Sequence, residues 1–269
     1  GEMGDSGGLV EVVLSRLLKV NRTLVHLQVA RNNISAAGAQ ALAAALKANS
    51  ALRALDIRSN NIADAGAEAL AEALKANRTL ASLNVIVNNI SAAGTQALAE
   101  ALKVNTVLTS LEIGGNLTVS VAGAKALAEA LKVNTALKTL NLESCSVFAA
   151  GAKALAEALK LNSCAMTSLQ LGLNKISDAG AQALAEGLKV NCTLSILDIR
   201  NNDISAVGAE ALAEALKVNS SLSTLDIRNN QVSDVGAQAF AGVLLVNCTL
   251  SKLYLGGNNI RSFPFSPEL

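Results

Sequence analysis

A pattern of 28 or 29 residues recurs along this chain and constrains its fold more than any other feature. In one clear copy, residues 222–232 follow the spacing LxxLxIxxNxV, and residues 236–244 carry a helical apolar spacing. The first large apolar residue of each copy is at Leu24, Leu52, Leu80, Leu108, Leu137, Met166, Leu194, Leu222 and Leu250. Nine starts at a nearly constant period indicate a solenoid, in which each unit depends on its neighbours for stability.

Each unit contains two periodicities. In LxxLxI the apolar side chains point inward from a short strand, and the intervening side chains point outward. In the second half, Ala67, Leu70, Ala71 and Leu74 form one apolar helix face. Since helices are wider than paired strands, the stack must curve, with the sheet concave and the helices convex. We therefore predict one curved α/β solenoid with parallel strands inside and helices outside.

Polar residues recur at the turns. An asparagine five places after the second leucine is expected to form a ladder between units, at Asn32, Asn60, Asn88, Asn116, Asn174, Asn202, Asn230 and Asn258. Serines are expected to cap the helices, at Ser35, Ser91, Ser177, Ser205 and Ser233.

The middle of the chain departs from the pattern, because Cys145 replaces a ladder asparagine, Phe148 takes a cap position, and residues 116–123 and 162–166 are each one residue longer. We interpret the insertions as drift in surface loops, since loop length costs little; a bulge with a local role is the alternative.

The predicted layout is a flexible leader or expression remnant (1–8) and one repeat domain (9–269), which comprises an N-terminal capping helix (9–20), nine strand repeats (21–260) and a C-terminal tail (261–269). Pro264 and Pro267 end the periodicity, and Phe263 and Phe265 are expected to cover the last open core. Alternatively, the final residues mark a boundary within a longer receptor-like or effector protein.

Composition argues against several partners. Lys plus Arg number 22 and Asp plus Glu 21, so no global field would attract nucleic acid or an anionic membrane. Apolar runs are too short for a membrane span. The start has no signal-peptide pattern, so a cytoplasmic protein is expected. We expect a monomer or weak self-association.

The cysteines do not have metal-site spacing. Cys145, Cys164, Cys192 and Cys248 contain no CxxC pair, and the chain has one histidine. Cys192 and Cys248 lie two repeats apart, or ~10 Å across stacked strands, beyond disulfide reach. We expect four free, mostly buried thiols, and no metal or cofactor.

The repeat resembles that of a known family. LxxLxLxxNxI followed by GAxALAEALK, over residues 21–260, is similar to the ribonuclease-inhibitor-type leucine-rich repeat found in the C-terminal regions of NOD-like receptors. The GAxALA-like elements begin at Gly38, Gly66, Gly94, Gly123, Gly151, Gly180, Gly208 and Gly236. The resemblance implies protein recognition, often on the concave face, and a possible sensing role in a larger receptor. Ran GTPase-activating protein and ribonuclease inhibitor share this repeat type, which implies the alternative of an enzyme regulator acting in trans.

Outward-facing strand positions are the candidate binding surface. The tripeptide DIR occurs three times there, and Tyr254 lies one repeat beyond the last copy. Arg and Tyr are enriched at interface hot spots. The predicted protein-binding residues are Arg58, Asp198, Arg200, Asp226, Arg228 and Tyr254. The alternative is that Asp and Arg neutralise each other on a solvated face. A second candidate patch combines exposed aliphatic residues with glycines, at Ile86, Val87, Gly114, Gly115, Gly172 and Leu173.

An enzymatic function is not expected. Hydroxyl residues line the strands, but nucleophilic catalysis needs a base against the hydroxyl, and His26 is two repeats from Ser82. No phosphate-binding glycine motif follows a strand. NxS/T sequons recur with the structural period and are interpreted as turn chemistry, at Asn21, Asn33, Asn77, Asn89, Asn191, Asn219 and Asn247. The sequence therefore predicts a non-catalytic binding module.

Overall fold

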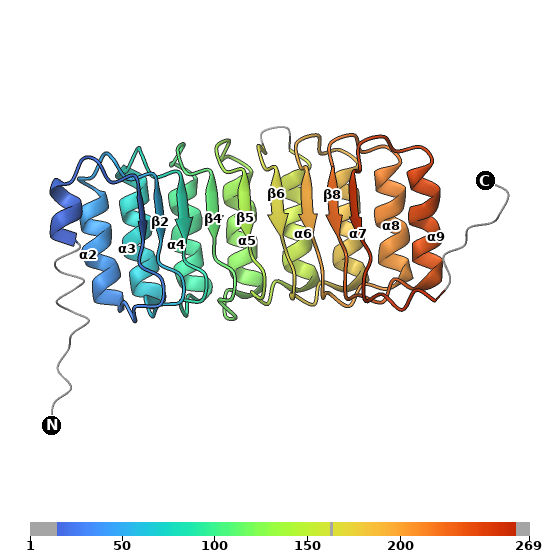
Figure 1. Cartoon of the computed structure of the whole chain (residues 1–269), viewed down its shortest axis with the longest axis horizontal. Helices are drawn as coiled ribbons and strands as arrows, with labels where there is room; N and C mark the ends of the chain where they lie inside the picture. The colour runs from blue at the N-terminus through green and yellow to red at the C-terminus, as the bar shows by residue number, and fades with distance from the viewer. Residues whose placement is uncertain (1–14, 162–163, 262–269) are drawn as a thin grey trace, which may run out of the picture.

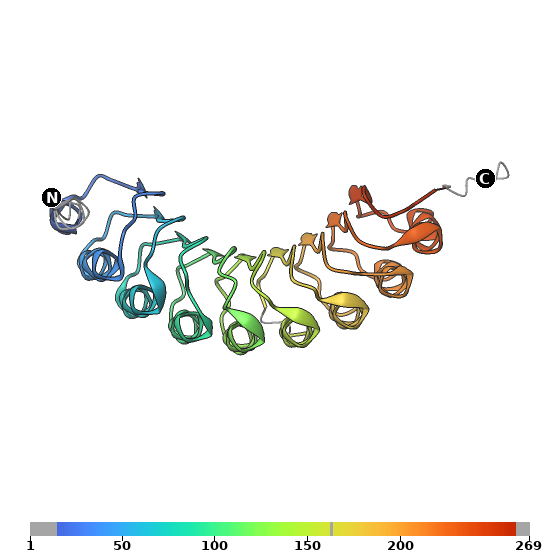
Figure 2. The ribbon, with the colours of Figure 1, turned by 90° about the horizontal axis from the view of Figure 1, so that it is seen from below.

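The described part of the chain is a curved solenoid. The structure is a computed structural model and describes residues 15–161 and 164–261. Strands line the inner side of the curve and helices the outer side (Figures 1 and 2). This arrangement confirms the predicted α/β class, concave sheet and convex helices.

Nine short strands form one parallel sheet in chain order. They are β1 (His26–Gln28), β2 (Ala54–Asp56), β3 (Ser82–Asn84), β4 (Ser110–Glu112), β5 (Thr139–Asn141), β6 (Ser168–Gln170), β7 (Ile196–Asp198), β8 (Thr224–Asp226) and β9 (Lys252–Tyr254). The central leucine of each strand pairs with that of the next, for example Leu55 with Leu83. Because this register is unbroken, every repeat presents its outward side chains in the same columns.

A helix follows each strand up to β8 and packs against the helices of the neighbouring repeats. The helices are α2 (Ala36–Leu46), α3 (Ala63–Ala76), α4 (Ala92–Leu102), α5 (Ser120–Leu131), α6 (Phe148–Leu159), α7 (Ser177–Leu188), α8 (Ala206–Leu216) and α9 (Ser233–Leu244). Residues 15–20 are also helical. The rest of the predicted capping helix, the leader, and the tail beyond Arg261 lie outside the described residues.

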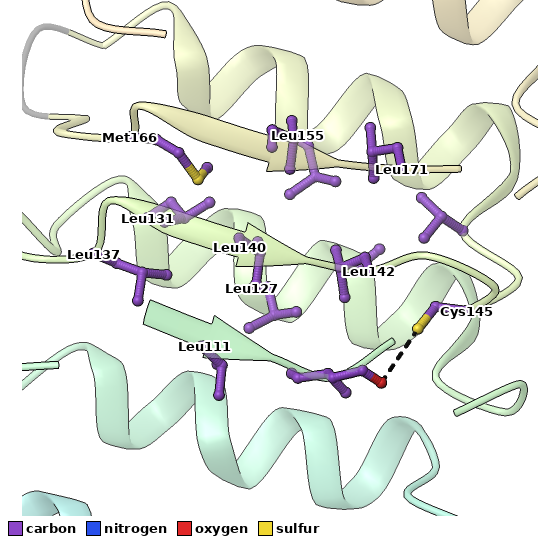
Figure 3. Close-up of a cluster of buried hydrophobic side chains, with 14 of the residues drawn as sticks. Leu111, Leu127, Leu131, Leu137, Leu140, Leu142, Cys145, Leu155, Met166 and Leu171 are labelled. Carbon is purple, nitrogen blue, oxygen red and sulfur yellow. Dashed lines mark hydrogen bonds between the residues drawn. The ribbon is translucent and has the colours of Figure 1, made fainter. Parts of the chain in front are cut away.

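The core is a continuous aliphatic layer between sheet and helices. Leu111 and Leu140 point from their strands toward Leu127 and Leu155 of the helices (Figure 3). These side chains are fully buried. Since a buried leucine contributes roughly 2 kcal/mol relative to an exposed one, the stacked leucines are the main source of stability.

The predicted asparagine ladder is confirmed. The Asn60 amide donates to the carbonyl oxygens of Ile57 (2.8 Å) and Val29 (3.0 Å), and its Oδ1 accepts from the backbone N–H groups of Asn32 (3.0 Å) and Ile34 (2.8 Å). One side chain therefore satisfies backbone groups in two repeats, which fixes one turn relative to the next.

A second ladder lies where each helix returns to the next strand. The Asn77 amide donates to the carbonyl oxygen of Leu46 (2.8 Å), and its Oδ1 accepts from Thr79 and Leu80. Its members are Asn49, Asn77, Asn105, Asn134, Asn191, Asn219 and Asn247. The four of them that lie in NxS/T sequons use their amides in turns, as predicted.

The prediction that all four cysteines are mostly buried is wrong for two of them. Cys145 and Cys164 are buried, whereas Cys192 and Cys248 are exposed. The exposed pair directly follows ladder asparagines, whose side chains point inward, so the next side chain points outward. Cys145 lies 3.7 Å from the carbonyl oxygen of Ile113 (Figure 3). Burial raises the pKa of the Cys145 thiol to about 12.

The serine caps are also only partly as predicted. Ser35, Ser91 and Ser205 are N-caps whose hydroxyls accept a helix N–H. Ser177 and Ser233 instead begin their helices in the left-handed region, at φ 54° and 58°, without capping them. In both cases the backbone N–H donates to a carbonyl oxygen of the next repeat, which imposes the different conformation.

An aspartate on one helix reaches across to the start of the next. Asp64 Oδ1 accepts from Ser91 N (2.7 Å), and its Oδ2 accepts from Ser91 Oγ (2.6 Å). Asp178 makes the same two contacts with Ser205. Adjacent helices are therefore linked at their N-terminal ends by a carboxylate that sequence analysis did not identify.

The inserted residue in 116–123 lengthens a turn without disturbing the sheet. β4 and β5 remain in register, with Leu111 opposite Leu140. Leu117 in this turn is exposed. The second predicted insertion, at 162–166, falls partly outside the described residues, and β5 and β6 are in register on either side of it.

Candidate protein-binding surface

On the concave face of the sheet, three side chains of each repeat point away from the core, and equivalent side chains of successive repeats form three columns. In the β8 repeat these residues are Thr224, Asp226 and Arg228. The middle column pairs in register and is mainly polar: Gln28, Asp56, Asn84, Glu112, Asn141, Gln170, Asp198, Asp226 and Tyr254. Within the described residues, no helix crosses this face (Figure 2). The middle column therefore forms a mainly polar stripe along the inside of the curve.

The three DIR copies do not have equivalent geometry. Arg58 makes a loose ion pair with Asp56, with 3.4 Å between Nε and Oδ2. Asp56 also accepts from Gln28 Nε2 at 3.3 Å. The Arg58 side chain is 47% exposed. This copy lies on β2, five strands from the copy at Asp198, so the structure separates Arg58 from the other predicted residues.

Arg200 is held by two carboxylates. Its Nη1 lies 2.6 Å from Asp198 Oδ2, and its Nη2 lies 2.8 Å from Glu143 Oε2. Only 29% of its side chain is exposed. Because both terminal nitrogens are occupied, Arg200 mainly connects repeats on the inner face.

A glycine makes the ion pair between Arg200 and Glu143 possible. Glu143 lies two repeats before Arg200, and Gly172 occupies the same column between them. A Cβ atom on Gly172 would lie 3.2 Å from Arg200 Cγ, closer than ordinary packing. This bridge was not predicted from the sequence, although opposite charges flanking a glycine at equivalent repeat positions were a usable signal.

Arg228 has a different arrangement. Its Nε and Nη2 donate to both oxygens of Asp226, at 2.9 and 2.6 Å. Its guanidinium lies over the ring of Tyr254, 5.3 Å from the ring centroid. The side chain is 46% exposed. Asp226 and Tyr254 therefore hold the Arg228 guanidinium in place, while part of the side chain stays exposed to solvent.

The two carboxylates of this end have opposite pKa shifts. Burial raises the pKa of Asp198, despite the opposing hydrogen bond and charge of Arg200. Burial also acts to raise the pKa of Asp226, but the hydrogen bonds from Arg228 outweigh it, and the pKa is lowered. The hydrogen bond to Glu143 raises the pKa of Arg200. Asp226 and Arg228 thus form a charged pair across the neutral pH range.

The glycine patch is not an open surface. Asn141 Oδ1 would lie 3.0 Å from a Cβ on Gly114, and the Arg200 side chain lies beside Gly172. Gly115 has a φ of 73° and lies against Val87. Neighbouring side chains therefore fill the space that the glycines leave, while Val87 and Leu173 remain exposed.

The described residues show no metal cluster, and His26 does not reach Ser82. No three His, Cys, Asp or Glu residues lie together as metal ligands within this part of the chain. His26 is exposed on β1, two strands from Ser82 on β3, or about 10 Å away and out of hydrogen-bond reach. None of the helices described is long and apolar enough to span a bilayer.

Comparisons with known proteins identify the repeat. A family model described as "Leucine Rich repeat" matches more than half of the chain, at residues 20–43, 48–71, 104–128, 133–156, 162–185, 190–213 and 218–241. It does not match β3 or β9, although both strands continue the sheet. The comparison with curated proteins finds no match.

Two solved structures are similar to parts of the chain. One is leiomodin-1 actin-binding site 2, with 26% identity and a TM-score of 0.42, over 48% of this chain and 76% of that chain. The other is the tropomodulin C-terminal domain of Caenorhabditis elegans, with 16% identity and a TM-score of 0.49, over 56% of this chain and 91% of that chain.

Proposed function

Because the chain belongs to the leucine-rich repeat family, we propose that it is a non-catalytic protein-interaction module that binds its partner across the concave sheet. The observation that carries this proposal is the inner face itself. Nine strands present polar side chains in register, and the helices lie entirely on the other side (Figure 2). A rigid surface of this kind binds with little ordering cost.

The charged end of this surface supplies the proposed anchors. Asp198, Arg200, Asp226, Arg228 and Tyr254 lie on three adjacent strands or directly after them. Aromatic and arginine side chains contribute most binding energy in known interfaces. Arg58 remains a proposed anchor for a partner long enough to reach β2.

We also propose that the repeats are of the ribonuclease-inhibitor type. Each outer segment from α2 to α9 is an α-helix of 11 to 14 residues. A full helix after each strand from β1 to β8 supports the ribonuclease-inhibitor type. A sensing role within a larger receptor rests on the resemblance to NOD-like receptors alone.

Site-specific photo-crosslinking tests the binding face. A photoreactive amino acid is placed at Ser110 or Thr224 on the inner face, and at Glu129 on α5 as a matched outer control. In an extract of the cells that make the protein, the inner positions should yield the same crosslinked partner, and Glu129 should not. Crosslinking from Glu129 alone would refute the concave site.

A further inference from the structure

We propose that the C-terminal end of the concave face recognises an acidic segment of a protein partner, with Arg228 binding one carboxylate and Lys252 a second. This inference rests on the proposed function and specifies the chemistry of the partner. It follows from differences among the three DIR copies and from the charge around β9.

Arg228 is the arginine with a donor available. Its Nε and Nη2 are occupied by Asp226, whereas Nη1 makes no hydrogen bond to the described residues. Arg200, by contrast, uses Nη1 and Nη2 for carboxylates of its own chain. Arg58 has neither a close ion pair nor an aromatic ring beneath it. Of the three, Arg228 alone combines an oriented guanidinium with a free terminal nitrogen.

Tyr254 strengthens this orientation. Its ring packs under the guanidinium, and 42% of the residue is still exposed. The cation–π contact and the Asp226 pair restrict the arginine before a ligand arrives. Part of the side-chain entropy that a flexible arginine would lose on binding is therefore already lost in the free protein.

Lys252 is the second cation at this end. It is exposed on β9, two residues before Tyr254, and so points from the same face of the sheet. Among the described residues no carboxylate forms an ion pair with it. Its strand neighbour is the uncharged Thr224. Lys252 is therefore available to an incoming anion.

The local charges favour an acid at this end over the middle of the face. Arg228 and Lys252 outnumber Asp226 by one positive charge. In the preceding repeats, Arg200 is neutralised by Asp198 and Glu143. An acidic segment is therefore attracted to β8 and β9, where cations are in excess.

The spacing of the two cations sets the spacing of the acids. The Arg228 guanidinium lies over the Tyr254 ring and pairs with Asp226, so its charge lies in the column of Asp226 and Tyr254, two residues along the strand direction from Lys252. At about 3.3 Å per residue this corresponds to roughly 7 Å, which an extended segment spans with acidic residues two positions apart. A phosphate dianion is less suitable, because Asp226 lies against Arg228 and one free guanidinium nitrogen cannot bind it in a bidentate manner.

Labelled peptides in fluorescence polarisation test the site. The probes are twelve-residue Gly-Ser peptides carrying two Glu residues two positions apart, two Glu residues adjacent, two Gln, two Lys or two phosphoserines. The peptide with Glu residues two positions apart should bind best. Arg228→Gln should weaken it at least tenfold, and Lys252→Gln severalfold. Arg78→Gln, at an exposed arginine in the turn before β3, and the outer-face Lys189→Gln are matched controls and should stay within twofold.

Other results of the same experiments would contradict the proposal. Absence of binding, equal binding of the Gln peptide, preference for phosphoserine, or an equal effect of Arg78→Gln would each overturn acid recognition. A thermal melt confirms that Arg228→Gln is folded, and Tyr254→Phe should retain binding because the ring is kept. If inner-face crosslinking persists while the acidic peptides fail, the concave site stands and only the partner chemistry is wrong.

Discussion

Replacing Asn202 with alanine tests whether the ladder holds the inner face together. Asn202 is fully buried. Its Oδ1 accepts from Asn174 N (3.0 Å) and Ile176 N (3.3 Å), and its amide donates to the carbonyl oxygens of Leu171 (2.8 Å) and Arg200 (3.0 Å). The substitution therefore affects four hydrogen bonds in two repeats.

The cost can be worked from the groups that lose their partners. Both carbonyl oxygens keep another donor, from Asn174 Nδ2 and Leu173 N respectively. The two N–H groups of Asn174 and Ile176 lose theirs. At about 1–3 kcal/mol for each buried unsatisfied group, Asn202→Ala should lower the free energy of unfolding by roughly 4 kcal/mol.

Urea denaturation and hydrogen exchange measure the effect. The unfolding midpoint should fall, and the amides of Asn174 and Ile176 should exchange faster by up to about a thousandfold. Asn32→Ala is the matched control, because Asn32 is an exposed ladder member whose amide makes a single 3.0 Å bond to Ala30. It should cost about 1 kcal/mol or less. A loss below about 1 kcal/mol for Asn202→Ala, or equal losses at both sites, would refute the reasoning.

Three further predictions concern thiols, helix starts and the inner bridge. A thiol reagent should label two of the four cysteines in the folded protein. Because folding keeps Cys145 protonated to about pH 12 while an unfolded thiol ionises near ~8.5, stability should fall as pH rises above that value, and the fall should be smaller in Cys145→Ala. Asp64→Ala should cost ~1 kcal/mol in urea at pH 7; since hydrogen bonds lower the Asp64 pKa in spite of burial, the deficit should shrink below ~pH 4. Gly172→Val should displace Arg200 from Glu143, visible as a shifted Arg200 side-chain NMR signal, at ~1 kcal/mol in stability and without weakening acidic-peptide binding at Arg228.

Much of the fold follows from the sequence because its information is local and repeated. The LxxLxI spacing indicates a strand, and the GAxALA spacing indicates a helix. Neither element can bury its apolar face alone, so stacking and curvature follow from the differing widths of strands and helices. The columns of the inner face follow as well, since the period aligns Asp198 with Asp226 and Asp226 with Tyr254.

The tertiary structure alone distinguishes residues that are identical in sequence context. Arg58, Arg200 and Arg228 all end a DIR tripeptide, yet one is loosely paired, one is held twice and one remains open. The difference arises from side chains in other repeats, such as Glu143 and Tyr254, which lie within reach only after stacking. The same holds for Ser177 and Ser233, whose conformation is set by the following repeat. A local pattern determines the scaffold because each unit repeats the same short-range physics, whereas charges and caps depend on contacts between units that differ.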